Sequence, residues 1–140
     1  MILLPSSPDM NNSRLGEIIR SIGENIEGRD GFWQFEFSGV RLVCITDDSH
    51  DRMRVMTPIA SMDDVNSDLL VACMNANFDR ALDARYCVNN EMLWGAFIHP
   101  LGSLTEGLFR SACYQVGEVA KNFGGSFSSG GLSFNTDIIE

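Results

Sequence analysis

The sequence predicts an α+β domain in which helices pack on an antiparallel sheet. Segments with apolar residues at alternate positions occur in groups joined by short polar turns, as in strands connected by hairpins. Segments with apolar residues three and four positions apart indicate helices before, between and after these groups. The length of 140 residues fits one domain. The predicted order of elements is α-β-β-β-α-β-β-α.

The first half of the chain predicts one helix and a three-stranded meander. Ser13 can cap a helix that runs to about Glu27, and Gly28 would end it. The first strand of the meander alternates aromatic and polar residues. The second strand is apolar on both faces, as in the centre of a sheet. The three strands are predicted over residues 32–37, 40–46 and 52–59.

A second helix is predicted from Ser61 to about Ala76, with Asp64 completing a capping box. Its stretch Leu69–Met74 is apolar around the whole circumference. A surface helix normally has one apolar stripe, so this helix is expected to be covered on two sides. A domain of this size offers few places for that, and the pattern therefore predicts a subunit interface.

The last part of the chain predicts a hairpin and a third helix. Strands over 80–88 and 91–98 are joined by Asn89-Asn90, and a helix over 103–123 opens with a capping box. One face of the last strand carries methionine and aromatic side chains, which are enriched at interfaces. The residues predicted to form a dimer or partner interface are Leu69, Leu70, Cys73, Met74, Met92, Trp94 and Ile98.

Both ends of the chain are predicted to be flexible. Residues 1–12 form an N-terminal arm and residues 124–140 a Gly- and Ser-rich tail, which leaves a single domain over 13–123. The N-terminus has no positively charged region followed by a long apolar stretch, so no export signal is expected. Four widely spaced cysteines in apolar segments predict buried free thiols. The expected location is the cytoplasm.

The charge of the chain argues against two classes of partner. The formal net charge is −9, from 19 acidic and 10 basic residues. Nucleic-acid binding depends on Lys and Arg side chains that neutralise phosphates, and an anionic membrane would repel this surface as well. The sequence therefore predicts neither a nucleic-acid partner nor a membrane partner.

Candidate chemistry is sparse, and no catalytic, cofactor or metal site is predicted. The densest set of polar side chains lies over 47–51, but it lacks the regular ligand offsets and the glycine of a calcium loop. A solvated turn is expected there. Cys44 and Cys113 lie in apolar segments, where a thiol is a poor nucleophile. The prediction is that the protein is not an enzyme.

Two segments carry a family resemblance. The runs 32–42 (FWQFEFSGVRL) and 46–54 (TDDSHDRMR), with the helix, hairpin and helix that follow, resemble the YbjN-like family of bacterial sensory-transduction regulators. The fold of that family is similar to that of the class I type III secretion chaperones. The resemblance covers about residues 13–123. It implies a type III secretion chaperone-like fold and a dimeric, protein-binding scaffold with no catalytic residues.

The sequence thus predicts a non-enzymatic, homodimeric chaperone-like protein or regulatory adaptor that binds other polypeptide. Two alternatives stay open. A small-molecule sensor would need polar groups converging in an apolar cavity. A structural subunit of a larger complex would use residues 124–140 as its docking peptide.

Overall fold

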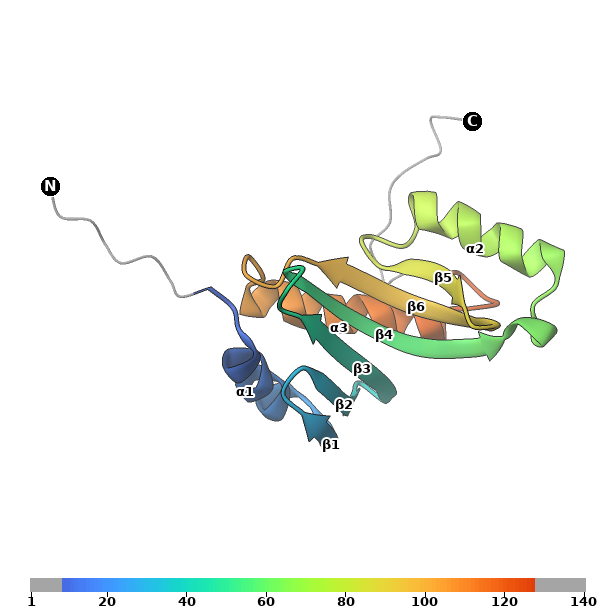
Figure 1. The fold of residues 1–140 in the computed structure, drawn as a ribbon. Helices are drawn as coiled ribbons and strands as arrows, with labels where there is room; N and C mark the ends of the chain where they lie inside the picture. Colours follow the sequence, from blue (N-terminus) through green and yellow to red (C-terminus); the bar gives the residue numbers. More distant parts are fainter. Residues whose placement is uncertain (1–8, 128–140) are drawn as a thin grey trace, which may run out of the picture.

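A computed structural model describes residues 9–127. It contains one six-stranded antiparallel sheet in the order β1-β2-β3-β4-β6-β5, and helices on one face and at one edge of it (Figure 1). The elements are α1 (Asn12–Ile22), β1 (Glu24–Arg29), β2 (Phe32–Phe37), β3 (Val40–Asp47), β4 (Arg52–Ser61), the 3₁₀ turn η1 (Met62–Asp64), α2 (Ser67–Asp79), β5 (Arg85–Asn89), β6 (Met92–His99) and α3 (Glu106–Lys121).

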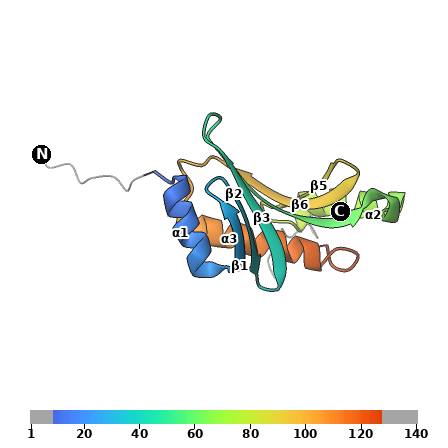
Figure 2. The ribbon, with the colours of Figure 1, turned by 60° about the horizontal axis from the view of Figure 1, so that its bottom comes forward.

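The hydrophobic core lies between the sheet and two of the helices. Figure 2 shows α1 and α3 on the same side of the curved sheet, with α1 beside β1 and β2. Phe109 of α3 packs against Phe35 of β2 with ring centroids 6.5 Å apart, and both rings are fully buried. The Tyr86 hydroxyl of β5 donates to the carbonyl of Val119 at 2.8 Å. The core therefore joins α3 to β2, next to one edge of the sheet, and to β5 at the other edge.

The predicted first helix is too long, and the first strand was missed. Helix α1 ends at Ile22, and the Gly23 N–H donates to the carbonyl of Ile19 at 2.8 Å. Residues 24–29 form β1, paired with β2. Gly28 lies at φ +109°, where a Cβ would stand 2.1 Å from the carbonyl oxygen of Phe32. This glycine therefore serves the close approach of β1 and β2 and not the end of a helix.

The second helix starts later than predicted because Ser61 caps a different element. The Ser61 hydroxyl accepts from the Asp63 N–H in η1, and the side chain of Asn66 accepts from the Leu69 N–H to cap α2. The third helix begins at Glu106, with Thr105 as its cap.

The last hairpin is shifted and shortened relative to the prediction. Its turn is Asn90–Glu91, and both residues have positive φ, as a type I′ turn requires. Residues 80–84 are not strand. Two of their N–H groups, at Asp83 and Ala84, donate to the buried side-chain oxygen of Gln115 at 2.9 and 3.1 Å. Gln115 of α3 therefore satisfies these two N–H groups without a partner strand, and β5 begins after them, at Arg85.

The described part of the chain reaches a short way into both predicted end segments. Met10 is buried, and its N–H donates to the carbonyl of Gly102 at 3.2 Å. Phe127 packs edge-on against Phe123 with ring centroids 5.7 Å apart, and against Tyr86 at 6.0 Å. Most of the predicted arm and tail, residues 1–8 and 128–140, lies outside the described residues.

Candidate functional site: a split in the sheet and an exposed helix

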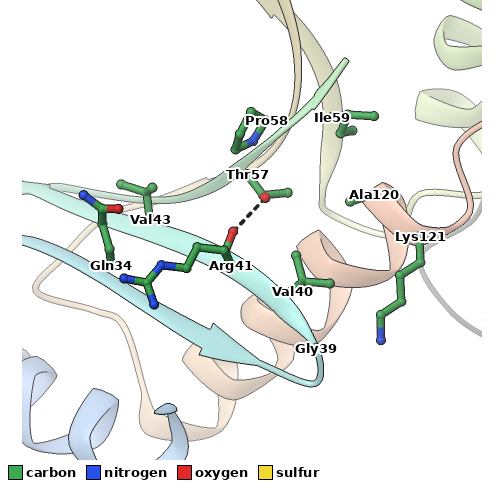
Figure 3. A pocket seen from close by; sticks show the side chains of 10 residues that line it. All are labelled: Gln34, Gly39, Val40, Arg41, Val43, Thr57, Pro58, Ile59, Ala120 and Lys121. Carbon is green, nitrogen blue, oxygen red and sulfur yellow. Dashed lines mark hydrogen bonds between the residues drawn. The ribbon is translucent and has the colours of Figure 1, made fainter. Parts of the chain in front are cut away.

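The sheet splits between the neighbouring strands β3 and β4. The pairing of β3 with β4 ends at Val43 and Met56, although β3 begins at Val40 and β4 continues to Ser61. Pro58 lies in the part of β4 that has left β3, and proline has no N–H to give to a ladder. The Thr57 hydroxyl instead donates to the carbonyl of Arg41 at 2.8 Å, across the opening (Figure 3).

The split forms a cleft of about 480 Å³, which is within the roughly 300–1,000 Å³ of ligand-binding pockets. Figure 3 shows side chains of β3 and β4 on its two sides and the C-terminal end of α3 below. Five of its ten lining residues have apolar side chains, and two are cations. The lining residues are Gln34, Gly39, Val40, Arg41, Val43, Thr57, Pro58, Ile59, Ala120 and Lys121, and we call this site the split-sheet cleft.

The two cations of the cleft come from different elements. Arg41 donates to the carbonyl of Asn25 at 2.7 Å and lies 3.4 Å from the carboxylate of Glu27. Lys121, the one lysine of the chain, donates to the carbonyl of Ser38 at 2.6 Å. That acceptor is uncharged, so the ammonium charge is not neutralised by it. In a chain of net charge −9, the Lys121 ammonium therefore places positive charge at the border of this apolar cleft, while the Arg41 guanidinium is paired with Glu27.

Three predicted interface residues lie together on β6. Met92 and Trp94 are half-buried, and Ile98 is 55% exposed. Trp94 and Ile98 share a shallow hollow of about 340 Å³ with Arg54 and Met56 of β4. These side chains alternate along their strands with core residues, so the hollow is on the sheet face opposite α1 and α3. The four other predicted interface residues are on α2.

Helix α2 has two apolar stripes on opposite sides. At 100° per residue, Leu69, Cys73 and Ala76 share one side, and the stripe at 71, 74 and 78 is about 180° from it. Cys73 and Ala76 are buried within the chain. The opposite stripe is open to solvent, with Val71 58%, Met74 46% and Phe78 72% exposed. Figure 1 shows α2 beside β5, at the end of the sheet away from α1.

Both edges of the sheet are protected against simple strand addition. The Asn77 side chain of α2 accepts from the Tyr86 N–H at 2.7 Å and donates to the Tyr86 carbonyl at 3.0 Å, as a neighbouring strand would. On the other edge, β1 is irregular between Glu24 and Glu27, and most of its residues are exposed. Charged side chains and bulges are common ways to blunt an edge.

Comparison with known proteins identifies the fold. The structure matches that of the HopA1-SchA chaperone-effector complex with a TM-score of 0.61 and 13% sequence identity, over 79% of this chain and 90% of that one. It also matches the ExsC-ExsE complex with a TM-score of 0.59 and 13% identity, over 80% and 92% of the two chains. The chain has a type III secretion chaperone-like fold. No family model and no curated protein matches its sequence.

The comparison confirms the predicted α+β class and the predicted chaperone-like fold. The observed sheet has one strand, β1, that the sequence did not predict. The resemblance to the YbjN-like family stays a prediction, since no family model supports it. No helix within residues 9–127 is long and apolar enough to cross a membrane.

Several ionisable side chains in the described part of the chain have a shifted pKa. Burial raises the pKa of the Cys44 and Cys113 thiols well above its usual range, so both are protonated at neutral pH. In the exposed 47–51 turn, hydrogen bonds from Ser49 and His50 lower the pKa of Asp47. No group of three or more His, Cys, Asp or Glu side chains within residues 9–127 is arranged to hold a metal ion.

The amino-acid sequence indicates the apolar surfaces of α2 and β6 but does not indicate the split-sheet cleft. Its residues come from β2, β3, β4 and α3, and up to 87 positions separate them along the chain (from Gln34 to Lys121). Pro58 is a local signal near the cleft, because a proline within a strand indicates the end or the edge of that strand. In the structure β4 continues past Pro58, while its pairing with β3 stops at Met56.

Proposed function

We propose that the protein is a non-enzymatic, homodimeric chaperone-like protein or regulatory adaptor that binds an extended segment of another polypeptide in the cytoplasm. The observation that carries this proposal is the split-sheet cleft, an apolar opening bordered by cations on the surface of an acidic chain. The fold supports it, because one of the similar structures is that of a chaperone-effector complex.

The chemistry of the cleft favours a polypeptide over a small polar ligand. The Arg41 carbonyl already accepts from Thr57, and Lys121 already donates to Ser38. A small ligand would need several polar groups that converge on it, whereas a peptide can be held by apolar side chains with a few charges at the margin. Since both sheet edges are blunted, we expect side-chain anchoring in the cleft to provide more of the affinity than strand addition.

The outer stripe of α2 supports the proposed homodimer. Val71, Met74 and Phe78 form one continuous apolar line on a helix that packs against the chain only through its other side. Exposed apolar stripes of this kind are typical of association surfaces. We propose that a second copy covers this stripe together with the half-buried Leu70, whereas Leu69 lies on the opposite side of the helix, with Cys73. Cys73, which is buried within the chain, supports the helix from beneath.

Replacing Met74 by aspartate is expected to shift the protein from dimer to monomer. The change puts a charge at the centre of the stripe, and burying it would leave a carboxylate without a partner. Loss of a central interface residue commonly costs more than about 1.4 kcal/mol, which corresponds to a dimer Kd raised at least tenfold. Light scattering coupled to size exclusion, over a concentration series, measures this Kd.

Asn75→Asp is the matched control. It adds the same charge on the next residue of α2, an exposed polar position 100° around the helix from Met74. We expect the control to keep the wild-type Kd. A wild-type protein that is monomeric at all concentrations, or a Met74→Asp protein that dimerises like wild type, would refute the assignment of the interface to α2.

Replacing Val43 by aspartate is expected to weaken client binding about tenfold. Val43 is a half-buried wall of the cleft, and a carboxylate there removes apolar contact and repels the acidic side chains that Arg41 and Lys121 would attract. The probe is a fluorescein-labelled, reduced and carboxymethylated protein, which stays unfolded and acidic. Fluorescence anisotropy gives its affinity for the wild-type and variant chains.

Val88→Asp provides the matched control for this measurement. Val88 is 51% exposed on β5, and its replacement makes the same chemical change outside the cleft. The control should bind the probe as wild type does. If Val43→Asp and Val88→Asp bind it equally well, the cleft is not the client site.

A further inference from the structure

The C-terminal end of the chain carries a pattern that matches the split-sheet cleft. Residues 137–140 read Asp-Ile-Ile-Glu, an aliphatic pair flanked on each side by a carboxylate. The cleft has the complementary composition. Its apolar lining from β3, β4 and α3 is bordered by Arg41 on β3 and by Lys121 at the end of α3 (Figure 3). Such complementarity of charge and apolar surface favours docking of this segment over docking of a neutral or basic one.

We propose that the segment Asp137–Glu140 binds in the split-sheet cleft of its own chain and competes there with the client polypeptide. The isoleucine pair provides the apolar contacts, and the two carboxylates interact with Arg41 and Lys121. The competition rests on the proposed function, because it assumes that the cleft is the client site. The docking itself does not, and it can be tested without any client.

The segment is tethered close enough to reach the cleft. The Phe127 N–H donates to the carbonyl of Asn122 at 2.9 Å. The last described residue is therefore held next to the C-terminal end of α3, where Lys121 lies. Asp137 is ten positions after Phe127, and an extended chain spans up to roughly 33 Å over that length. A short flexible linker gives a tethered ligand an effective concentration of the order of millimolar. Weak docking is therefore sufficient for substantial occupancy.

The cleft suits this segment better than the hollow on β4 and β6. Arg54 is the cation that lines that hollow, and the rest of its lining is neutral. Arg85, on the neighbouring strand, donates to the carbonyls of Ala81, Leu82 and Ala84. Two separated cations around one apolar opening occur at the cleft, where they match the two carboxylates of the segment.

The first test compares backbone amide NMR spectra of the full chain and of its Ile138→Asp/Ile139→Asp variant. Loss of docking is expected to shift amides that line the cleft, such as those of Arg41, Val43 and Lys121, and to leave those of α2 unchanged. The matched control is Leu132→Asp/Phe134→Asp, which makes the same kind of change a few positions before the segment. This control should leave the cleft amides as in wild type.

The second test adds the docking segment in trans. A fluorescein-labelled peptide with the sequence of residues 128–140 is titrated onto the Ile138→Asp/Ile139→Asp chain, in which its own segment is disabled. We expect saturable binding that is weakened about fivefold by Lys121→Glu, the upper end for loss of an exposed ion pair. Arg110→Glu makes a comparable charge change on α3, at a position paired with Glu106, and should change the affinity less than twofold.

Absence of peptide binding, or cleft amides that are identical in wild type and the Ile138→Asp/Ile139→Asp chain, would overturn the proposal. So would equal effects of Lys121→Glu and Arg110→Glu, which would indicate general charge attraction. If the peptide docks but the unfolded probe does not bind, the docking inference stands and the proposed client function fails. If Ile138→Asp/Ile139→Asp also tightens binding of the unfolded probe, the competition is confirmed.

Discussion

Replacing Phe109 by alanine is expected to lower the free energy of unfolding by about 3–5 kcal/mol, the usual cost of removing a buried phenylalanine ring. Phe109 is fully buried in the first turns of α3, and its ring packs on that of Phe35. The cavity would open between α3 and the sheet, where β2, β3 and α1 also contribute to the core. Since rigid walls on several sides limit collapse, we expect the upper half of the range. Urea unfolding followed by circular dichroism measures the loss.

Tyr114→Ala is the matched control for this prediction. Tyr114 is an aromatic residue on the same helix, but 46% of its surface is exposed. Its truncation leaves little or no cavity, so a cost below about 1 kcal/mol is expected. Equal losses in the two variants would mean that Phe109 has no special place in the core.

Elements with strong local signals could be predicted from the sequence. The β2–β3 hairpin is an example, because alternating residues flank Ser38-Gly39 and both turn residues adopt positive φ. The region after α1 shows why other elements could not. Ile22 and Ile26 extend the helical spacing of the preceding residues, yet Gly23 ends the helix and Ile26 lies in β1. Pairing with β2 outweighs the weak local preference for helix over these few residues.

Of the two parts of the candidate site, the surface of α2 could be predicted from the sequence and the split-sheet cleft could not. The two apolar sides of α2 follow from helical periodicity, so a sequence pattern can reveal them. The split-sheet cleft depends on where β4 leaves β3, and on the packing of α3 beneath the opening. Lys121 reaches the cleft only because α3 ends near the Ser38–Gly39 turn. No pattern along one segment contains this information, since the contacts join residues that are distant in the chain.

The remaining large effect is a loss of stability at alkaline pH. Cys44 and Cys113 are fully buried, and burial raises the pKa of both thiols far above the ordinary value of 9.0. In the unfolded chain the thiols ionise as the pH passes about 9, while in the folded chain they stay protonated. The unfolded state then binds fewer protons, so the free energy of unfolding falls as the pH rises. The stabilisation is complete below pH 9 and is lost above it.

At pH 10 an unfolded thiol is about 90% ionised, which costs the folded state about 1.4 kcal/mol per thiol, or about 3 kcal/mol for the two. Urea unfolding at pH 8 and pH 10, with a reductant present, measures this difference. The Cys44→Ala/Cys113→Ala variant starts from a lower stability at pH 8, because both changes leave small cavities. Its further loss between pH 8 and pH 10 should nevertheless be smaller than that of wild type by about the same 3 kcal/mol. A variant that loses as much as wild type over this interval would show that other groups control the alkaline transition, and Cys73, whose pKa burial raises to about 11, would be the next residue to replace.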